Sequence, residues 1–78
     1  MTGWSLIDAI AMERRHVLAW EASVVRQDAL TAKLHAGGHD QLAASAVELL
    51  ELFRDMLKFS RVRLRQLEAP AAKAADPN

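Results

Sequence analysis

The chain contains no cysteine and no tyrosine, and it has only two prolines and three glycines among its 78 residues. Without cysteine it cannot form a disulfide, a thiolate zinc site or a cysteine nucleophile. A surplus of basic residues is missing as well, because ten acidic and ten basic side chains give a formal net charge of zero. Binding to nucleic acid or to anionic lipid depends on a basic surplus or a basic patch. The charge balance therefore argues against both kinds of partner.

Long apolar runs are also missing. The longest uncharged stretches, Met1–Ile7 and Gln41–Val47, are seven residues each, whereas a membrane-spanning helix needs ~20 apolar residues. Residues 1–8 have neither the basic region nor the apolar region of a secretory signal. We expect a soluble, cytoplasmic protein with one small domain.

Two stretches of helix-forming residues lie on either side of the only glycine pair, Gly37-Gly38. The first, residues 6–36, contains no proline or glycine and is dominated by strong helix formers. Ser5 is placed to cap this helix, with Asp8 as its capping-box partner three residues later. Gly37 suits the left-handed position that follows many helix ends. Residues 1–5 are expected to form only a lead-in and cap.

The second helix is predicted over residues 41–68, with Asp40 as its N-cap and Pro70 as its stop. The intervening turn, residues 37–40, is so short that the two helices must be antiparallel neighbours. Residues 69–78 have no periodic apolar positions and are predicted to be a disordered tail. No segment alternates as a strand does. The predicted fold is therefore an all-α, two-helix antiparallel hairpin over residues 6–68.

The second helix has a simple amphipathic pattern, which we interpret as the core of the hairpin. Leu42, Leu49 and Met56 are expected to widen its main stripe. The members of that main stripe recur at spacings of three and four: Ala46, Leu50, Phe53, Leu57, Ser60, Leu64 and Leu67.

The first helix has two apolar rows, which together cover about half of its circumference, more than one partner helix buries. One row is Leu6, Ile10, Val17, Trp20 and Val24, and the other is Ile7, Ala11, Leu18, Ala22, Val25 and Ala29. Between the rows runs a seven-residue repeat that is mainly charged: Ile7, Arg14, Glu21, Asp28 and His35.

The excess apolar surface predicts that the hairpin associates, most simply as a homodimer that forms a four-helix bundle. If the first helix packed antiparallel on its own copy, centred on Glu21, Arg14 would face Asp28 of the other chain. A helical partner protein would also satisfy the pattern, and the sequence does not separate the two. We predict the following interface residues: Ile10, Arg14, Val17, Trp20, Glu21, Val24, Asp28, Leu50, Phe53, Leu57 and Leu64.

Glu13 and His16 have the Glu-x-x-His spacing that ferritin-like bundles use to hold iron or manganese. Such sites also need a glutamate from each of two other helices. In the predicted hairpin Glu13 lies opposite Arg63, and no acidic residue of the second helix is at that level. We therefore predict no metal and no cofactor, with a ferritin-like metal-binding half-bundle as the alternative.

Arg61, Arg63 and Arg65 form the only basic cluster, which suits the C-terminal end of a helix dipole. A small regulatory nucleic-acid-binding protein is the second alternative that this cluster leaves open. No nucleophile elbow or phosphate loop is present, and two helices give no walls to a water-excluding pocket. We therefore expect no enzyme. Trp4 is either packed over the first turn or exposed as a contact residue. The sequence favours a non-catalytic protein–protein interaction or assembly module, acting as a homo-oligomer or a small subunit of a larger complex.

Overall fold

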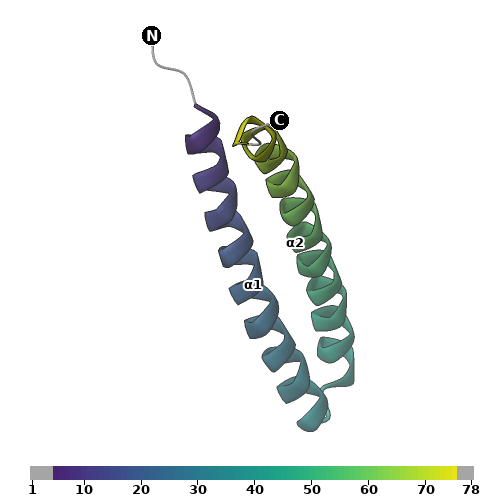
Figure 1. Cartoon of the computed structure of the whole chain (residues 1–78). Helices are drawn as coiled ribbons and strands as arrows, with labels where there is room; N and C mark the ends of the chain where they lie inside the picture. The colour runs from purple at the N-terminus through teal and green to yellow at the C-terminus, as the bar shows by residue number, and fades with distance from the viewer. Residues whose placement is uncertain (1–4, 76–78) are drawn as a thin grey trace.

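The computed structural model describes residues 5–75, with side chains described as far as Ala69. These residues form two helices, α1 (Leu6–Ala36) and α2 (Asp40–Ala75), which pack against each other. The helices lie side by side and antiparallel, and the start of α1 and the end of α2 lie at the same end of the hairpin (Figure 1). The described part of the chain is therefore all-helical, and the predicted helical hairpin is confirmed. The predictions for residues 1–4, including Trp4, lie outside the described residues.

The start of α1 is fixed by a reciprocal capping box. Ser5 Oγ accepts a hydrogen bond from the Asp8 backbone N–H at 3.1 Å, and Asp8 Oδ2 accepts one from the Ser5 N–H at 3.4 Å. Two of the donors that a helix leaves unpaired at its start are thus satisfied by side chains close in sequence. The aspartate performs the role for which glutamate is the more common residue.

The end of α1 is a Schellman motif, and it corrects the role predicted for Gly37. Gly37 is the C-cap with φ −83°, whereas the next residue, Gly38, has φ 75°. The Gly38 N–H donates to the carbonyl of His35 at 3.1 Å, and the His39 N–H donates to that of Leu34 at 2.9 Å. These two bonds need the left-handed residue one position later than we predicted. Gly38 therefore turns the chain.

Helix α2 starts and ends differently from the prediction. The Ala43 N–H donates to the His39 carbonyl at 2.8 Å, so His39 occupies the N-cap position. Asp40 is a first-turn residue, where its charge suits the helix dipole. At the other end α2 continues past Pro70 to Ala75 instead of stopping at Glu68. Residues 69–75, which we predicted as part of a disordered tail, are therefore helical, and the prediction for residues 76–78 lies outside the described residues. Proline costs the helix one N–H···O bond, but the alanines around it are the strongest helix formers and offset part of that cost.

The core between the helices is thin. The buried apolar residues are two alanines and two leucines: Ala43, Ala46, Leu50 and Leu57. Around them the remaining apolar residues that we predicted as contact residues are only half-buried: Ile10, Val17, Trp20, Val24, Phe53 and Leu64. The rings of Trp20 and Phe53 pack across the core at a centroid distance of 5.6 Å.

Four of the buried residues are polar: Glu13, Gln27, Thr31 and Ser60. Gln27 Nε2 donates to the Ala46 carbonyl at 3.1 Å, which joins α1 to α2, and Thr31 Oγ1 donates to the Gln27 carbonyl at 2.8 Å. Among the described residues no large side chain is completely buried. Half of the buried positions in the described part of the chain are therefore polar, and the apolar half is made of small or medium-sized residues.

Candidate functional site

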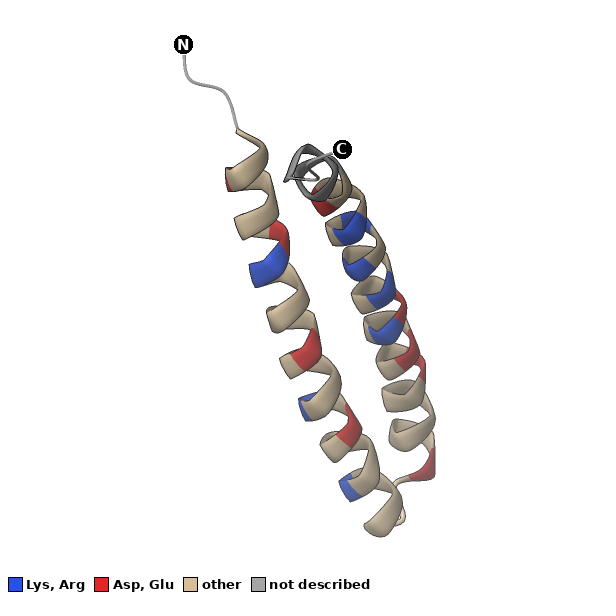
Figure 2. Ribbon diagram, in the orientation of Figure 1, with Lys and Arg blue, Asp and Glu red and all other residues tan. Residues whose placement is uncertain are grey.

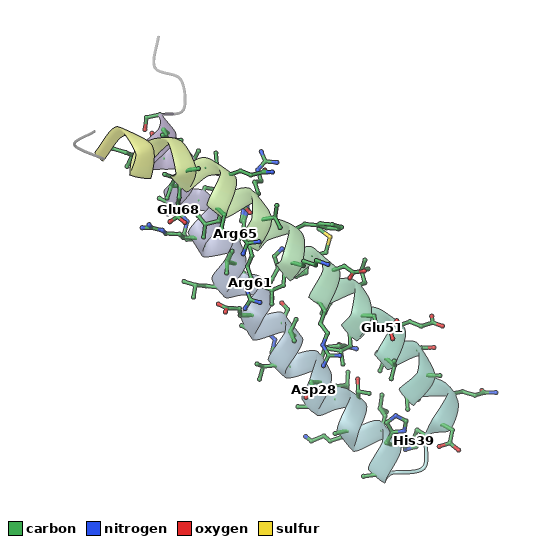
Figure 3. All side chains as sticks on the ribbon, turned by 45° about the vertical axis from the view of Figure 1, so that its right-hand side comes forward. Asp28, His39, Glu51, Arg61, Arg65 and Glu68 are labelled. Atoms are coloured by element: carbon green, nitrogen blue, oxygen red, sulfur yellow. The ribbon has the colours of Figure 1, made fainter. Side chains whose placement is uncertain are left out.

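One flank of the hairpin carries a ladder of three ion pairs between α1 and α2, which we call the ladder flank. Its pairs are Arg14–Glu68 at 2.8 Å, Glu21–Arg61 at 3.0 Å and Asp28–Arg54 at 4.0 Å. Each step is seven residues forward on α1 and seven backward on α2, as the antiparallel arrangement requires. Asp28, Arg61 and Glu68 lie along this flank in Figure 3.

The ladder changes the interpretation of the charged repeat on α1. The sequence suggested that Arg14 faces Asp28 of a second copy, with Glu21 next to its own counterpart. In the structure all three side chains have partners of opposite charge on α2 of the same chain. The pairs lie at the edge of the α1·α2 contact and remain solvated, so a second copy is not needed to balance these charges.

Beyond the ladder, α1 presents an apolar row to solvent. This back row is the second of the two rows found in the sequence, and all its members are exposed: Ile7, Ala11, Leu18, Ala22, Val25 and Ala29. Leu18, at 66% exposure, is typical of its larger members. The first row faces α2 instead. One helix partner therefore leaves a full apolar row of α1 uncovered.

A second exposed apolar surface runs along α2, and we call it the outer stripe. It consists of five large side chains: Leu42, Leu49, Leu52, Met56 and Phe59. Leu42, Leu49 and Met56, which we expected to widen the core stripe, are exposed because they lie about 100° around the helix from it. Leu52 and Phe59 complete the stripe and were not singled out from the sequence. The available signal was a second series at three-and-four spacing, displaced by one residue from the first.

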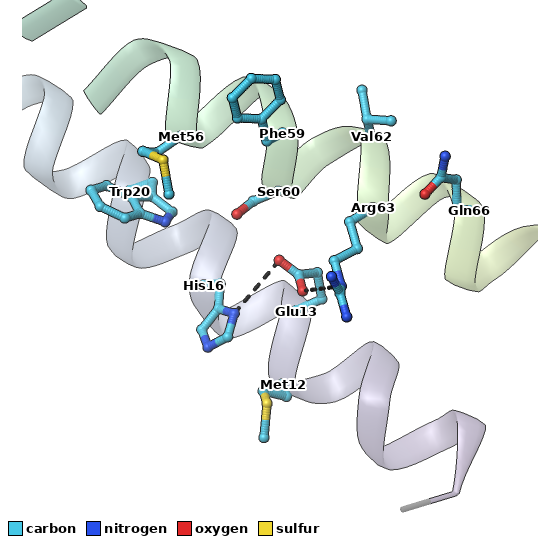
Figure 4. Close-up of a pocket in the computed structure, with 10 residues that line it drawn as sticks. All are labelled: Met12, Glu13, His16, Trp20, Met56, Phe59, Ser60, Val62, Arg63 and Gln66. Atoms are coloured by element: carbon cyan, nitrogen blue, oxygen red, sulfur yellow. Dashed lines mark ion pairs between the residues drawn. The ribbon is translucent and has the colours of Figure 1, made fainter. Parts of the chain in front are cut away.

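The outer stripe borders a groove between the helices (Figure 4). From the helix periodicity, the residues that line the groove lie on the other side of the core from the ladder residues. The groove has a volume of about 650 Å³ and is lined from α1 by Met12, His16 and Trp20 and from α2 by residues that include Met56 and Phe59. Five of the ten lining residues are apolar and five are polar or charged, but most of the lining surface is apolar, and the groove is open to solvent along its length. We call this side of the hairpin the groove flank.

Glu13 lies at the floor of the groove and is only 6% exposed. Its Oε1 is 3.4 Å from Arg63 Nε, and its Oε2 is 3.6 Å from His16 Nδ1 (Figure 4). The predicted position of Glu13 opposite Arg63 is thus what the structure shows. The group of α2 that faces this carboxylate is therefore a guanidinium and not a second carboxylate. Within the described residues no group of three or more His, Asp or Glu side chains is arranged to hold a metal ion.

The arginines of the basic cluster do not form a single patch. Arg61 pairs with Glu21 on the ladder flank, whereas Arg63 pairs with Glu13 on the groove flank. Figure 2 shows acidic residues on α1 across from the basic turns of α2, and further acidic residues on α2 on either side of those turns. Two of the three guanidinium groups are therefore balanced by carboxylates of α1 on opposite sides of the hairpin, which does not favour a nucleic-acid interface.

Comparisons with protein-family models, with curated proteins and with solved structures find no match for this chain. Neither of the two described helices has a segment that is apolar and long enough to cross a bilayer.

Proposed function

We propose that this chain is a non-catalytic assembly module, a helical hairpin that pairs with a second copy of itself to form a four-helix bundle. The observation that carries the proposal is the mismatch between the core and the surface. The α1·α2 contact buries only two alanines and two leucines among its apolar residues, while α2 exposes five large apolar side chains in one continuous stripe. Stripes with three-and-four spacing are typical of helix–helix contacts.

The magnitudes favour association. Full burial of one exposed Leu, Met or Phe side chain contributes ~1.5–3 kcal/mol. Partial burial of five such side chains in each of two copies is therefore comparable with, or larger than, the ~4–15 kcal/mol that association costs in lost freedom of motion. A hairpin with a thin core gains more from such a contact than a protein whose core is already complete.

The groove supports an interaction surface rather than a reaction site. It is open along its length, and its most buried ionisable residue, Glu13, is already paired with Arg63. Catalysis by charged groups depends on a water-excluded site with donors aimed at the reacting atoms. An open groove with a mostly apolar lining surface, flanked by an apolar stripe, is instead suited to receive side chains from another helix.

Sedimentation equilibrium combined with circular dichroism over a dilution series tests the proposal. We expect a mass of twice 8.6 kDa at micromolar concentration, and we expect helicity to fall together with the mass on dilution. A species with the mass of one chain that keeps full helicity at every concentration would overturn the proposal.

A further inference from the structure

The hairpin has two exposed apolar faces, and they differ in what a second copy would have to bury. The back row of α1 is half alanine and adjoins the ladder flank, so a partner seated there would also desolvate charges of the three ion pairs. Removing paired charges from water costs several kcal/mol per ion. The groove flank holds one ion pair, Glu13–Arg63, whose carboxylate is already buried, and it offers five large apolar side chains and a groove. The groove flank is therefore the better contact face.

The two edges of the groove flank carry opposite charge. On α1, Arg26 and Lys33 lie two and three heptads after Met12, which lines the groove. Arg26 Nη2 also donates to Ser23 Oγ at 3.2 Å, which lies one heptad after the groove residue His16. Arg26 and Lys33 are both exposed. The α1 edge of the groove flank is therefore basic.

On α2, the corresponding edge is acidic. Glu48 and Asp55 lie two heptads and one heptad before Val62, which also lines the groove. Both carboxylates are exposed, and neither belongs to the ladder or to the Glu13 cluster. A copy that approaches the groove flank therefore meets a basic edge on one helix and an acidic edge on the other.

Two symmetric arrangements bring the groove flanks of two copies face to face. If the turns lie at opposite ends, α2 packs on α2 of the other copy, and the Glu48–Asp55 edge meets its own like charges. If the turns lie at the same end, α1 of each copy packs on α2 of the other, and basic edges meet acidic edges. Opposite charges across an interface favour the second arrangement, because like charges in contact cost several kcal/mol.

In the second arrangement, residues at the same height along the hairpin face each other across the two copies, so contacts within one hairpin predict the contacts between copies. Gln27 bonds to Ala46 within the hairpin, so Arg26 is level with residues next to Glu48 and faces Glu48 of the other copy. Glu13 contacts Arg63, so Phe59 is level with His16 and lies over the groove of the other copy. We infer that two copies pair through their groove flanks with both turns at the same end, α1 of each against α2 of the other. This inference rests on the assembly proposed above.

A pair of matched substitutions tests the face. Phe59 and Leu18 are almost equally exposed, at 64% and 66%, but lie on the groove flank and on the back row. We expect Phe59→Glu to raise the dimer dissociation constant at least about 30-fold, as loss of a hot-spot side chain does. Leu18→Glu is expected to leave it within about threefold, as for residues outside an interface. The reverse result, with a dimer that Leu18→Glu disrupts, would overturn this face while leaving the assembly proposal intact.

A charge exchange tests the pairing without touching the apolar surface. Arg26→Glu and Glu48→Arg should each weaken the dimer several-fold, and the double variant should restore the affinity, because both edges are reversed together. Failure of the double variant to recover affinity would overturn the predicted contact. A wild-type chain that does not dimerise would overturn the assembly proposal itself.

The orientation has its own measurement. Since the chain has no cysteine, a single Ala36→Cys substitution next to the turn allows one spin label per copy. Helix axes in a bundle are ~8–10 Å apart, so turns at the same end predict a label separation below about 30 Å. Because α1 is 31 residues long, turns at opposite ends predict about 45 Å. The longer distance would overturn the proposed orientation.

Discussion

Gln27 joins the two helices through a buried hydrogen bond. Its side chain is buried, and its amide donates to the Ala46 carbonyl at 3.1 Å. That carbonyl belongs to the backbone of α2, and it accepts this hydrogen bond from a side chain of the other helix. A single amide thus fixes the level of one helix against the other at the centre of a thin core.

Substitution of Gln27 should separate shape from hydrogen bonding. Gln27→Glu replaces a donor with a carboxylate that faces a carbonyl in a buried position, and we expect a loss of ~1–3 kcal/mol in the free energy of unfolding. Gln27→Met keeps the volume and introduces no charge, so it should cost less than about 1 kcal/mol. Urea denaturation followed by circular dichroism measures both. Equal losses in the two variants would contradict a role for the hydrogen bond.

At the scale of the helices, the order of charges in the ladder specifies the register. Arg14, Glu21 and Asp28 on α1 oppose Glu68, Arg61 and Arg54 on α2. A slip of one heptad in one direction places Glu21 next to Glu68, and a slip in the other direction places Arg14 next to Arg61. Each exposed pair contributes only ~0.2–1 kcal/mol, but each one-heptad slip keeps a single attractive pair, Asp28–Arg61 or Glu21–Arg54, and adds a like-charged one. The ladder therefore selects the register more than it stabilises the fold.

The middle rung provides a reciprocal test of this selection. Glu21→Arg and Arg61→Glu should each destabilise the hairpin by up to about 1 kcal/mol, because each creates a like-charged pair. The double variant should recover most of the loss, and the coupling should shrink at high salt, since these side chains are solvated. Additive losses in the double variant would show that the two side chains do not interact.

The turn allows a comparison of two neighbouring glycines. Gly38 has φ 75°, so Gly38→Ala forces a side chain into the left-handed region and should cost ~1–2 kcal/mol. Gly37 has φ −83°, and an added Cβ would lie 3.0 Å from the His39 ring carbon Cδ2, which can move. We expect Gly37→Ala to be the milder change in thermal denaturation. A larger loss for Gly37→Ala would contradict the assignment of the turn.

Features set by neighbours in sequence were predictable, and features set by the other helix were not. Ser5, Asp8 and the absence of helix breakers define the start and body of α1. The extent of α2 past Pro70 was missed, because a single proline was treated as a stop although alanines surround it. The ladder was missed because a charged repeat between two apolar rows has the same pattern whether its partner is in the same chain or in another one. Only the packing of α1 on α2 decides between them.

For the whole molecule, the thin core predicts stability that depends on protein concentration. If folding includes pairing, each tenfold rise in concentration adds ~1.4 kcal/mol to the apparent unfolding free energy. With a slope of ~1–3 kcal/mol per molar urea, the unfolding midpoint should rise by roughly 0.5–1.4 M per decade. Urea titrations at concentrations a hundredfold apart measure the shift. A midpoint that does not change with concentration would show that the single hairpin is stable alone.

The position of the turn gives the hairpin a polarity that engineering can use. The start of α1 and the end of α2 project from one pole, and the bend around Gly38 forms the other. A fluorescent domain genetically fused at either helix end would sit at the same pole, about one α1 length, ~46 Å, from the bend. An epitope grafted into the bend would remain accessible to an antibody whatever the fused domains covered.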